Sequence, residues 1–325
     1  MHPAFSVIFL TTLIGAGQGL FLALFTVESY AAFGLLPAQA SGFYAFGSLV
    51  ALILLALGLF ASFFHLGHPE RAWRAATQWR TSWLSREVIA LPAFMGAVSL
   101  YGLAHGFELN PVLASLPSGA PVHLTAVLGS LGTVLAFALF ICTGMIYACL
   151  KFLREWHTPL TVINYILLGG ASGFTLAAAF AAQQAPEVMP LLAGWALILT
   201  VLGFFSRSAS LVRNARLKPK STLQTAIGIK HPKIVQKSMG FMGGSFNTRE
   251  FFHGKPRALL RMVKWFFLAA AFVLPLILLA AGLVQAAGGW LMLAFVVQYL
   301  GLLAERWFFF AQANHPQNLY YQSVA

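Results

Sequence analysis

Residues 63–74 read Phe63-Phe64-His65-Leu66-Gly67-His68-Pro69-Glu70-Arg71-Ala72-Trp73-Arg74, and the polar character continues to Arg86-Glu87. This stretch lies between two long apolar segments. It gathers histidine, arginine, glutamate and tryptophan where the hydrocarbon core of a bilayer would meet water. An ionisable cluster between two segments of spanning length predicts a helical membrane protein, and it marks the part of the chain richest in reactive side chains.

The composition of the whole chain agrees with that interpretation. Of its 325 residues, 59% are hydrophobic and 9% are charged, whereas soluble domains carry about 25% charged residues. The apolar residues do not alternate with polar ones, which disfavours an outer-membrane barrel. Cys142 and Cys149 lie too far apart along one helix for a disulfide, and two thiolates are too few for an iron–sulfur cluster.

Eight apolar segments are long enough to cross about 30 Å of hydrocarbon. They cover approximately residues 6–28, 43–65, 86–106, 122–150, 160–183, 188–208, 262–285 and 288–311. The sixth is short and its ends are poorly defined. We therefore expect an all-α integral membrane protein in which residues 1–325 form a single domain of eight transmembrane helices.

The basic residues fall in alternate connections between these segments. Of the 20 lysines and arginines, four lie in 66–86, two in 151–159 and thirteen between Arg207 and Lys264, and the last is Arg306 at the start of the tail. The other connections hold none. Cytoplasmic loops carry the excess of Lys and Arg, so this pattern predicts that both termini are cytoplasmic.

The connection at about 209–261 is the largest polar region, and it is basic with interspersed aromatic residues. Its composition fits equally well attraction to anionic lipid and docking of a cytoplasmic partner. Binding to nucleic acid is disfavoured, because the basic residues are confined to one side of the membrane. The candidate docking residues are Arg213, Lys218, Lys220, Lys230, Lys233 and Arg249.

Glycines recur within several of the apolar segments. The first segment carries Gly15, Gly17 and Gly19, and the fifth carries Gly169, Gly170 and Gly173. Small residues let transmembrane helices approach closely, so these positions predict helix packing rather than a nucleotide site.

The ionisable cluster suits a quinone. A quinone headgroup has two carbonyls that accept hydrogen bonds, and its reduction takes two electrons and two protons. His65 can donate or accept a proton near neutral pH, Glu87 begins to enter the apolar zone and can relay protons, and Arg71 stays charged. We expect Glu87 to pair with Arg71, Arg86 or His65.

Other interpretations of the same residues are weaker. His65 and His68 have the spacing of metal ligands but lack a matched pair elsewhere, so we expect no metal site. His105 and His123 both lie near the outer face, where a haem is conceivable but disfavoured. A secondary transporter would need ionisable residues or broken helices at mid-membrane, and the eight segments hold almost no charge there. A purely structural anchor would make the cluster incidental.

Several motifs resemble the membrane anchor subunits of dimethyl sulfoxide reductase-type molybdoenzymes. They are residues 2–9 with Thr11-Thr12, the run from Gly15 to Leu20, His65-Leu66-Gly67 with Arg71-Ala72, and Ser85-Arg86-Glu87. The tail, residues 304–311 with 314–318, looks most like the anchor of membrane-bound sulfite dehydrogenase complexes. The resemblance covers essentially the whole chain.

The resemblance implies a bacterial inner-membrane subunit that binds quinone, ubiquinone or menaquinone, beside an iron–sulfur subunit, which relays electrons to or from a molybdopterin catalytic subunit. The anchor itself is not the catalyst for the substrate and usually carries no haem. The family's quinone-site residues map onto His65, Gly67, Arg71 and Glu87.

The resemblance has one departure. The familiar sulfoxide reductase anchor faces the periplasm, whereas the charge count here places the motif in the cytoplasm. This favours sulfite oxidation coupled to quinone reduction over a sulfoxide reductase that oxidises quinol.

Overall fold

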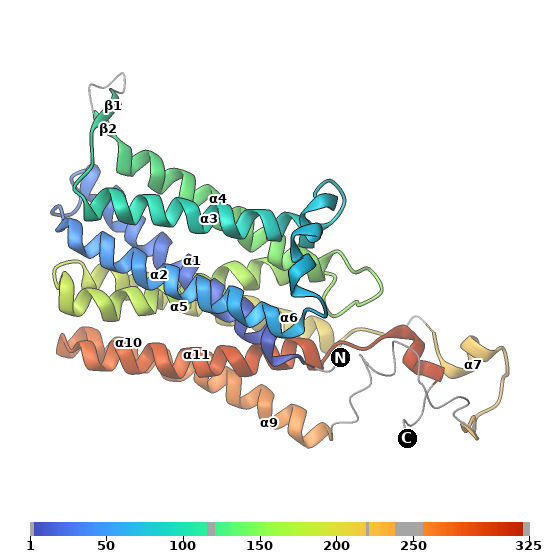
Figure 1. Cartoon of the computed structure of the whole chain (residues 1–325). Coiled ribbons are helices and arrows are strands. Elements are labelled where there is room, and N and C mark those ends of the chain that lie inside the picture. The colour runs from blue at the N-terminus through green and yellow to red at the C-terminus, as the bar shows by residue number, and fades with distance from the viewer. Residues whose placement is uncertain (1–2, 116–120, 219–220, 238–255, 321–325) are drawn as a thin grey trace.

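The computed structural model describes residues 3–115, 121–218, 221–237 and 256–320. Among them, eight helices are long and apolar enough to cross a membrane, and they lie roughly parallel in one bundle (Figure 1). The long helices are α1 (Phe5–Ala32), α2 (Ser41–Ser62), α3 (Trp83–Gly106), α4 (Leu124–Ala148), α5 (Pro159–Gln184), α6 (Met189–Ala215), the composite α9–η3–α10 (Arg257–Gln285) and α11 (Gly288–Ala311).

The shorter elements lie at the two ends of the bundle. The 3-10 helices η1 (Phe63–His65) and η2 (Pro69–Gln78) follow α2, and η4 (Pro316–Tyr320) follows α11. Helix α7 (Leu223–Ile227) lies in the connection after α6. Strands β1 (Val112–Ser115) and β2 (Pro121–His123) pair antiparallel between α3 and α4, with Val112 opposite His123. The sequence did not predict this small hairpin.

The prediction of an all-α protein with eight spans is confirmed, and most boundaries agree within a few residues. The predicted end of the sixth span, residue 208, is wrong, because α6 continues to Ala215. Its last two turns contain polar residues, which lowered the hydropathy, but Arg207 and Ser210 are buried against other helices. The basic connection is therefore shorter than 209–261, since helices occupy both of its edges.

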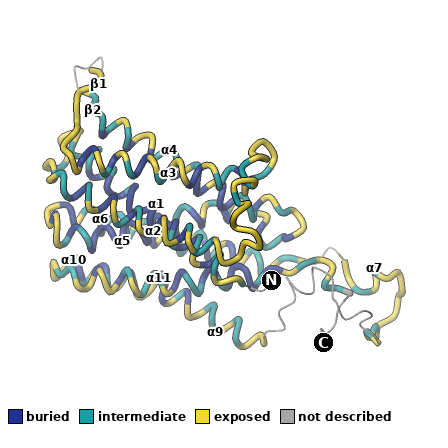
Figure 2. The backbone as a smooth tube through the Cα atoms, in the orientation of Figure 1, coloured by how far each residue is buried: buried dark blue, intermediate teal, exposed yellow. Residues whose placement is uncertain are grey.

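Helices α1 and α5 form the centre of the bundle and are the most buried of the spans, as Figure 2 shows for α1. Their backbones touch where they cross. A Cβ atom added at Gly19 would lie 2.2 Å from the carbonyl oxygen of Gly169, and one at Gly173 would lie 2.1 Å from the carbonyl carbon of Gly19. Only glycine fits at such a crossing, so the predicted packing role of these glycines is confirmed.

The polar connections gather at one end of the bundle, which we call the basic end (Figure 1). Residues 63–82, 149–158, 216–218 and 221–237 lie there, as do both ends of the described chain. The β1–β2 hairpin and the turn between α10 and α11 lie at the opposite end. An even number of spans puts both termini on one side, in agreement with the charge pattern.

The seventh span changes from α-helix to a π-helical turn at Ala269–Val273. Pro275 lacks an amide hydrogen, which leaves the Ala271 carbonyl without its usual α-helical donor. The amide of Gln298 on α11 donates to that carbonyl at 3.4 Å. Gly301 keeps this part of α11 close, since a Cβ there would lie 2.3 Å from the Ala271 nitrogen.

Candidate functional site

A folded loop at the basic end carries the motif found in the sequence. His68 has a non-helical backbone (φ −138°, ψ 75°), since the following Pro69 disfavours the helical conformation, so the chain turns through η1 and η2. Ser82 caps α3 by accepting from the Ser85 amide at 3.3 Å. Arg86 then donates to the carbonyls of Trp79 and Arg80 at 2.9 and 2.8 Å. These bonds close the loop over the last turn of α2 and the first turn of α3.

Between the loop and the helices lies a cavity of about 240 Å³, which we call the apolar cavity. His65 from η1 and Glu87 from α3 both line it, and among the described residues they are its only ionisable lining groups. The remaining lining side chains are mostly aliphatic or aromatic: Leu10, Leu59, Ser62, Phe63, Leu66, Ala72, Trp73, Ala75, Leu84, Val88, Leu91 and Pro92. The structure thus brings together two of the four predicted quinone-site residues.

Glu87 also borders a second, much smaller cavity. This polar cavity of about 10 Å³ is lined by Thr11, Ile14, Gly15, Gln18, Phe140, Thr143, Tyr165 and Glu87. The hydroxyl of Thr143 on α4 donates to the Glu87 carboxylate. The expected partners were Arg71, Arg86 or His65, and this expectation is wrong. Glu87 lies on the face of α3 toward α4, and the Arg86 guanidinium is used in the loop.

Gly67 and Arg71 do not line the apolar cavity. The Arg71 guanidinium lies 3.6 Å from the Glu70 carboxylate, with both side chains largely exposed. His68 pairs with the same carboxylate at 3.1 Å. Glu70 therefore holds the His68 and Arg71 side chains on the water side of the loop, and the predicted role of Gly67 and Arg71 in binding quinone stays a prediction.

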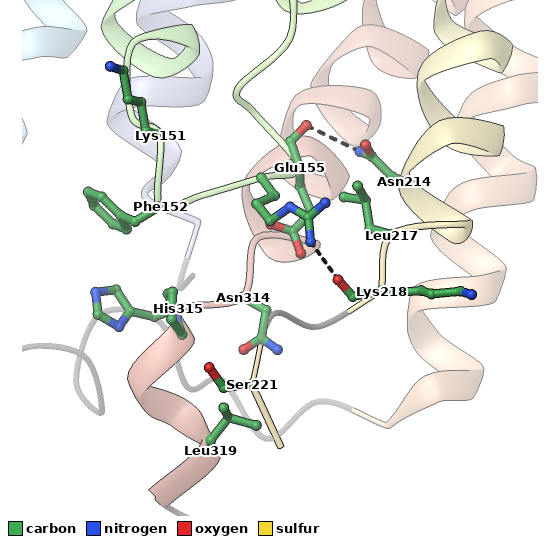
Figure 3. A pocket seen from close by; sticks show the side chains of 12 residues that line it. Lys151, Phe152, Glu155, Asn214, Leu217, Lys218, Ser221, Asn314, His315 and Leu319 are labelled. Carbon is green, nitrogen blue, oxygen red and sulfur yellow. Dashed lines mark hydrogen bonds between the residues drawn. The ribbon is translucent and has the colours of Figure 1, made fainter. Parts of the chain in front are cut away.

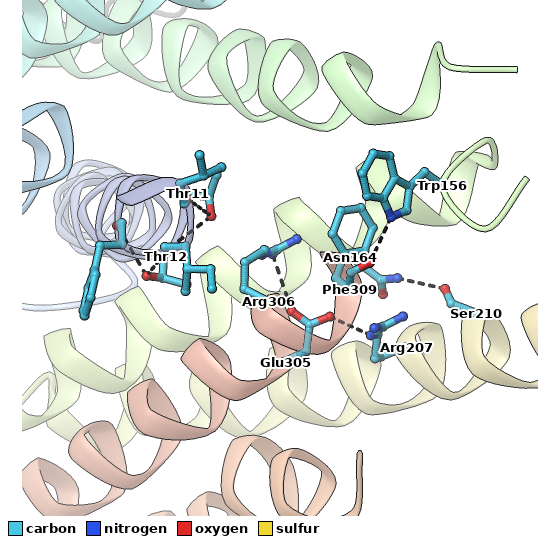
Figure 4. Close-up of polar contacts among 12 residues, drawn as sticks. Thr11, Thr12, Trp156, Asn164, Arg207, Ser210, Glu305, Arg306 and Phe309 are labelled. Atoms are coloured by element: carbon cyan, nitrogen blue, oxygen red, sulfur yellow. Dashed lines mark hydrogen bonds and ion pairs between the residues drawn. The ribbon is translucent and has the colours of Figure 1, made fainter. Parts of the chain in front are cut away.

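Sequence reasoning missed a buried ionic cluster formed by Arg207, Glu305 and Arg306. Arg207 Nε lies 2.6 Å from Glu305 Oε1, and Arg306 Nη2 lies 3.7 Å from Glu305 Oε2. Figure 4 shows Glu305 between the two arginines. All three residues are at most 5% exposed. The Arg306 guanidinium also lies 3.9 Å from the ring centre of Tyr165.

This cluster corrects the assignment of Arg207 to a connection and of Arg306 to the tail, since both lie inside helices α6 and α11. It also corrects the expectation that the spans hold almost no charge. The adjacent Glu305-Arg306 pair within the last apolar segment was the available signal. Desolvated charges in a span need partners, and two cations face one carboxylate here.

A groove of about 450 Å³ opens at the basic end between the 149–158 connection, the end of α6 and η4 (Figure 3). Of the predicted docking residues, Lys218 lines this groove. Lys230 and Lys233 are exposed and follow Lys218 by 12 and 15 residues in the sequence. Lys220 and Arg249 lie outside the described residues. Lys151 and Arg154 add positive charge to the groove.

Arg213 serves the fold itself. Its guanidinium donates to the carbonyls of Arg154 and His157 at 2.9 and 3.2 Å, which ties the 149–158 connection to α6. Its neighbour Asn214 donates to the Glu155 carbonyl at 3.3 Å, as Figure 3 also shows. These bonds fix the groove's rim, and the predicted docking role of Arg213 stays a prediction.

The two histidines considered for haem lie in separate environments. His105 is buried between the rings of Tyr44 and Tyr101, with centroids 4.5 and 4.6 Å away, and its Nε2 lies 3.6 Å from Glu28. His123 lies at the end of β2, where its Nδ1 is 3.3 Å from the Asn110 carbonyl. The structure does not bring these two side chains together.

Comparisons with known proteins bear on the whole chain. The family model described as DMSO reductase anchor subunit matches residues 1–311. A sulfite dehydrogenase subunit of Allochromatium vinosum is 58% identical over 325 residues, which is 100% of both chains. The matched residues include the eight spans, the loop that carries His65 and the residues that line the apolar cavity beside Glu87. This chain belongs to the DMSO reductase anchor subunit family.

Proposed function

We propose that this chain is the quinone-reactive anchor of a sulfite-oxidising complex, in which electrons from sulfite reach quinone in the membrane. As an anchor subunit of this family it works in a multi-subunit complex. The observation that carries the quinone proposal is the apolar cavity, which combines an aliphatic and aromatic wall with one histidine and one glutamate. The likeness to a sulfite dehydrogenase subunit over the full length supports sulfite as the electron source.

The cavity fits a quinone headgroup in size and chemistry. Pockets for drug-sized ligands have about 300–1,000 Å³, so 240 Å³ suits a single ring whose tail runs out along apolar side chains. Leu10, Leu59 and Leu91 supply such a wall. When bound, a quinone takes up two electrons and two protons on becoming quinol.

The chain's own residues supply hydrogen bonds and protons at this cavity. His65 is exposed at one side, so its imidazole can donate a hydrogen bond inward and exchange protons with water. Glu87 faces the cavity from the protein side and can hold a proton, with Thr143 fixing its carboxyl group. Leu84, Val88 and Trp73 supply apolar lining beside these two groups, and such low polarity strengthens hydrogen bonds formed there.

We further propose that the basic end faces the cytoplasm and that an iron–sulfur subunit docks there, followed by a molybdopterin catalytic subunit. All the described lysines and arginines outside the buried ionic cluster lie toward this end, and the 450 Å³ groove is lined by Lys151, Arg154 and Lys218. The apolar cavity opens at the same end, so electrons from a docked cluster have a short path to quinone. Charge reversal by Lys230→Glu and Lys233→Glu should weaken co-purification of the partner subunit.

The quinone proposal is tested in the purified complex with two electron acceptors. His65→Ala and Glu87→Gln should abolish sulfite-dependent reduction of a soluble quinone, while sulfite oxidation continues with an artificial acceptor that takes electrons directly from the molybdopterin subunit. His68→Ala and Glu108→Gln are matched controls, because both side chains are exposed and neither lines the cavity. Arg71→Ala, compared with Arg80→Ala, tests whether Arg71 contributes.

Normal quinone reduction in both the His65→Ala and Glu87→Gln complexes would contradict the proposal. The family description also fits an anchor that oxidises quinol for a sulfoxide reductase. Assaying the same complex with quinol and dimethyl sulfoxide distinguishes the two directions of electron flow.

A further inference from the structure

The polar cavity behind Glu87 has no part in the function proposed so far. Glu87 is the one residue that lines both the apolar cavity and the polar cavity among the described residues. Its carboxyl group therefore lies between the apolar cavity at the basic end and the small polar cavity that residues of α1, α3, α4 and α5 line. Side chains that line the polar cavity can bond or orient Glu87 without touching a ligand in the apolar cavity.

The polar cavity has the size and the lining of a binding site for one water molecule. A cavity of about 10–15 Å³ by this measure holds one water molecule, which needs two to four polar partners. The cavity measures about 10 Å³, and Thr11, Gln18, Thr143 and Tyr165 line it together with Glu87. A cavity of this size with an apolar lining alone would hold no water. The polar side chains here favour a bound water.

The Tyr165 hydroxyl supplies a second, independent observation. It is buried and forms no well-aligned hydrogen bond with a described residue, although the Tyr147 hydroxyl, the Arg306 guanidinium and the Glu87 carboxylate all lie close enough to interact with it. A buried hydroxyl without a well-aligned partner destabilises the folded protein. One water between the Tyr165 hydroxyl and the Glu87 carboxyl group would remove that cost.

The buried ionic cluster holds Tyr165 in place. The Arg306 guanidinium stacks on the Tyr165 ring at 3.9 Å, and Arg306 is in turn paired with Glu305. From the α4 side, the Tyr147 ring stacks on Tyr165 with centroids 6.0 Å apart. The tyrosine therefore has little freedom to turn away from the cavity.

We propose that one water molecule binds between Glu87 and Tyr165, and that Tyr165 is a positioning residue for proton exchange at Glu87. This rests on the proposed function of Glu87 in quinone reduction. In each cycle the Glu87 O–H bond breaks as its proton leaves toward the apolar cavity, and a new one forms with a proton from the aqueous phase. The bound water donates a hydrogen bond to the carboxylate and so orients it; the water is not itself deprotonated, because the replacement proton comes from the aqueous phase at the basic end.

Tyr165→Phe in the whole complex removes only the hydroxyl. We expect a several-fold fall in kcat for quinone reduction, an unchanged KM for quinone and a larger solvent deuterium isotope effect. In infrared difference spectra the carboxyl band that Glu87→Gln eliminates should shift, because it loses the bridging water. Tyr299→Phe is the matched control: it removes a hydroxyl bonded to Thr12 at 3.1 Å, away from the cavity.

An unchanged carboxyl band and unchanged kinetics in Tyr165→Phe would overturn the inference. If that variant fails to assemble, Thr11→Val removes a hydroxyl that lines the same cavity but does not bond Glu87, and an unshifted band there would overturn it equally. If Glu87→Gln itself reduces quinone normally, the proposed function fails and the carboxyl assignment with it. If only Glu87→Gln is inactive, the proposed function stands and the water site does not.

Discussion

Glu305 is a residue whose charge is almost completely removed from water. It is 1% exposed, and its carboxylate is shared between Arg207 from α6 and Arg306 from its own helix. Each of these ions would be costly alone in a low-dielectric interior. Together they tie α6 to α11, and through the ring of Tyr165 they also reach α5.

Removing the carboxylate from this cluster should destabilise the protein strongly. In Glu305→Gln two buried guanidinium groups face each other without an anion, and breaking a buried ion pair from one side costs about 3–5 kcal/mol. We expect a large fall in the thermal unfolding temperature of the purified complex, or loss of assembly. Glu187→Gln, which changes an exposed carboxylate, should unfold like the wild type; a Glu305→Gln complex of equal stability would contradict this interpretation.

Glu155, on the rim of the basic-end groove, gives a prediction about pH. Burial raises the pKa of its carboxyl group above the usual 4.5, and hydrogen bonds from backbone amides oppose this only in part. The folded state therefore binds the proton more tightly than the unfolded state. The stabilising contribution is complete below the unfolded pKa and is lost as the pH rises through the folded pKa.

Glu155→Gln should consequently raise the unfolding temperature by a few degrees at most near pH 7, where the wild type carries a half-buried carboxylate. Near pH 4 the two proteins should unfold at nearly the same temperature, because both side chains are then neutral. Unfolding curves of the complex at both pH values check this. A gain that appears only at the lower pH would reverse the sign of the argument.

At the scale of the elements, the crossing of α1 and α5 determines how tightly the bundle is packed. Gly19 and Gly173 bring the two backbones into contact, and a Cβ at Gly173 would lie 2.1 Å from the Gly19 carbonyl carbon. Gly173→Ala therefore has to push the central helices apart. Overpacking of this kind costs about 1–3 kcal/mol, and more where backbone atoms must move.

Gly194→Ala is the matched comparison, because a Cβ there meets nothing within 4 Å. A helix-interior glycine replaced by alanine without a clash gains up to about 1 kcal/mol. We expect Gly173→Ala to lower the yield and thermal stability of the purified complex and Gly194→Ala to leave both unchanged or slightly higher. Similar behaviour of the two variants would show that the crossing tolerates a side chain.

The helices themselves could be predicted from the sequence because a bilayer imposes length and apolar character on every span. The exceptions have local causes. Helix α6 continues past its apolar part, since Arg207 and Ser210 are buried against other helices. The π-helical turn at Ala269–Val273 depends on Pro275 and on the Gln298 amide of another helix, which no pattern within one segment reveals.

The candidate site could be predicted only in part, for a reason that concerns the whole molecule. His65 and Glu87 stood out because they are ionisable residues at the ends of apolar segments. Thr143, which donates to Glu87, and Tyr165, which lines the same cavity, come from α4 and α5, and which helices face each other is a tertiary property. Arg71 was grouped with them by proximity in sequence, but the loop turns its side chain toward Glu70.

The orientation in the membrane is the property on which the docking proposal depends. The described basic residues outside the buried cluster lie toward one end of the bundle, and the hairpin end carries glutamates such as Glu108 and Glu187 instead. Because Lys and Arg in short loops are retained on the cytoplasmic side, the basic end should be cytoplasmic. Both ends of the bundle have exposed positions. A cysteine introduced at each end, labelled by a reagent that cannot cross the membrane, shows which end faces the cytoplasm.

In a background with Cys142→Ser and Cys149→Ser, Leu109→Cys places a thiol at the hairpin end and Thr81→Cys places one in the loop at the basic end. Both positions are exposed. A membrane-impermeant maleimide should label the Leu109→Cys protein in spheroplasts and the Thr81→Cys protein only in inverted vesicles. The reverse pattern would place the apolar cavity and its partner subunits on the periplasmic side, and the complex would then need its catalytic subunits exported.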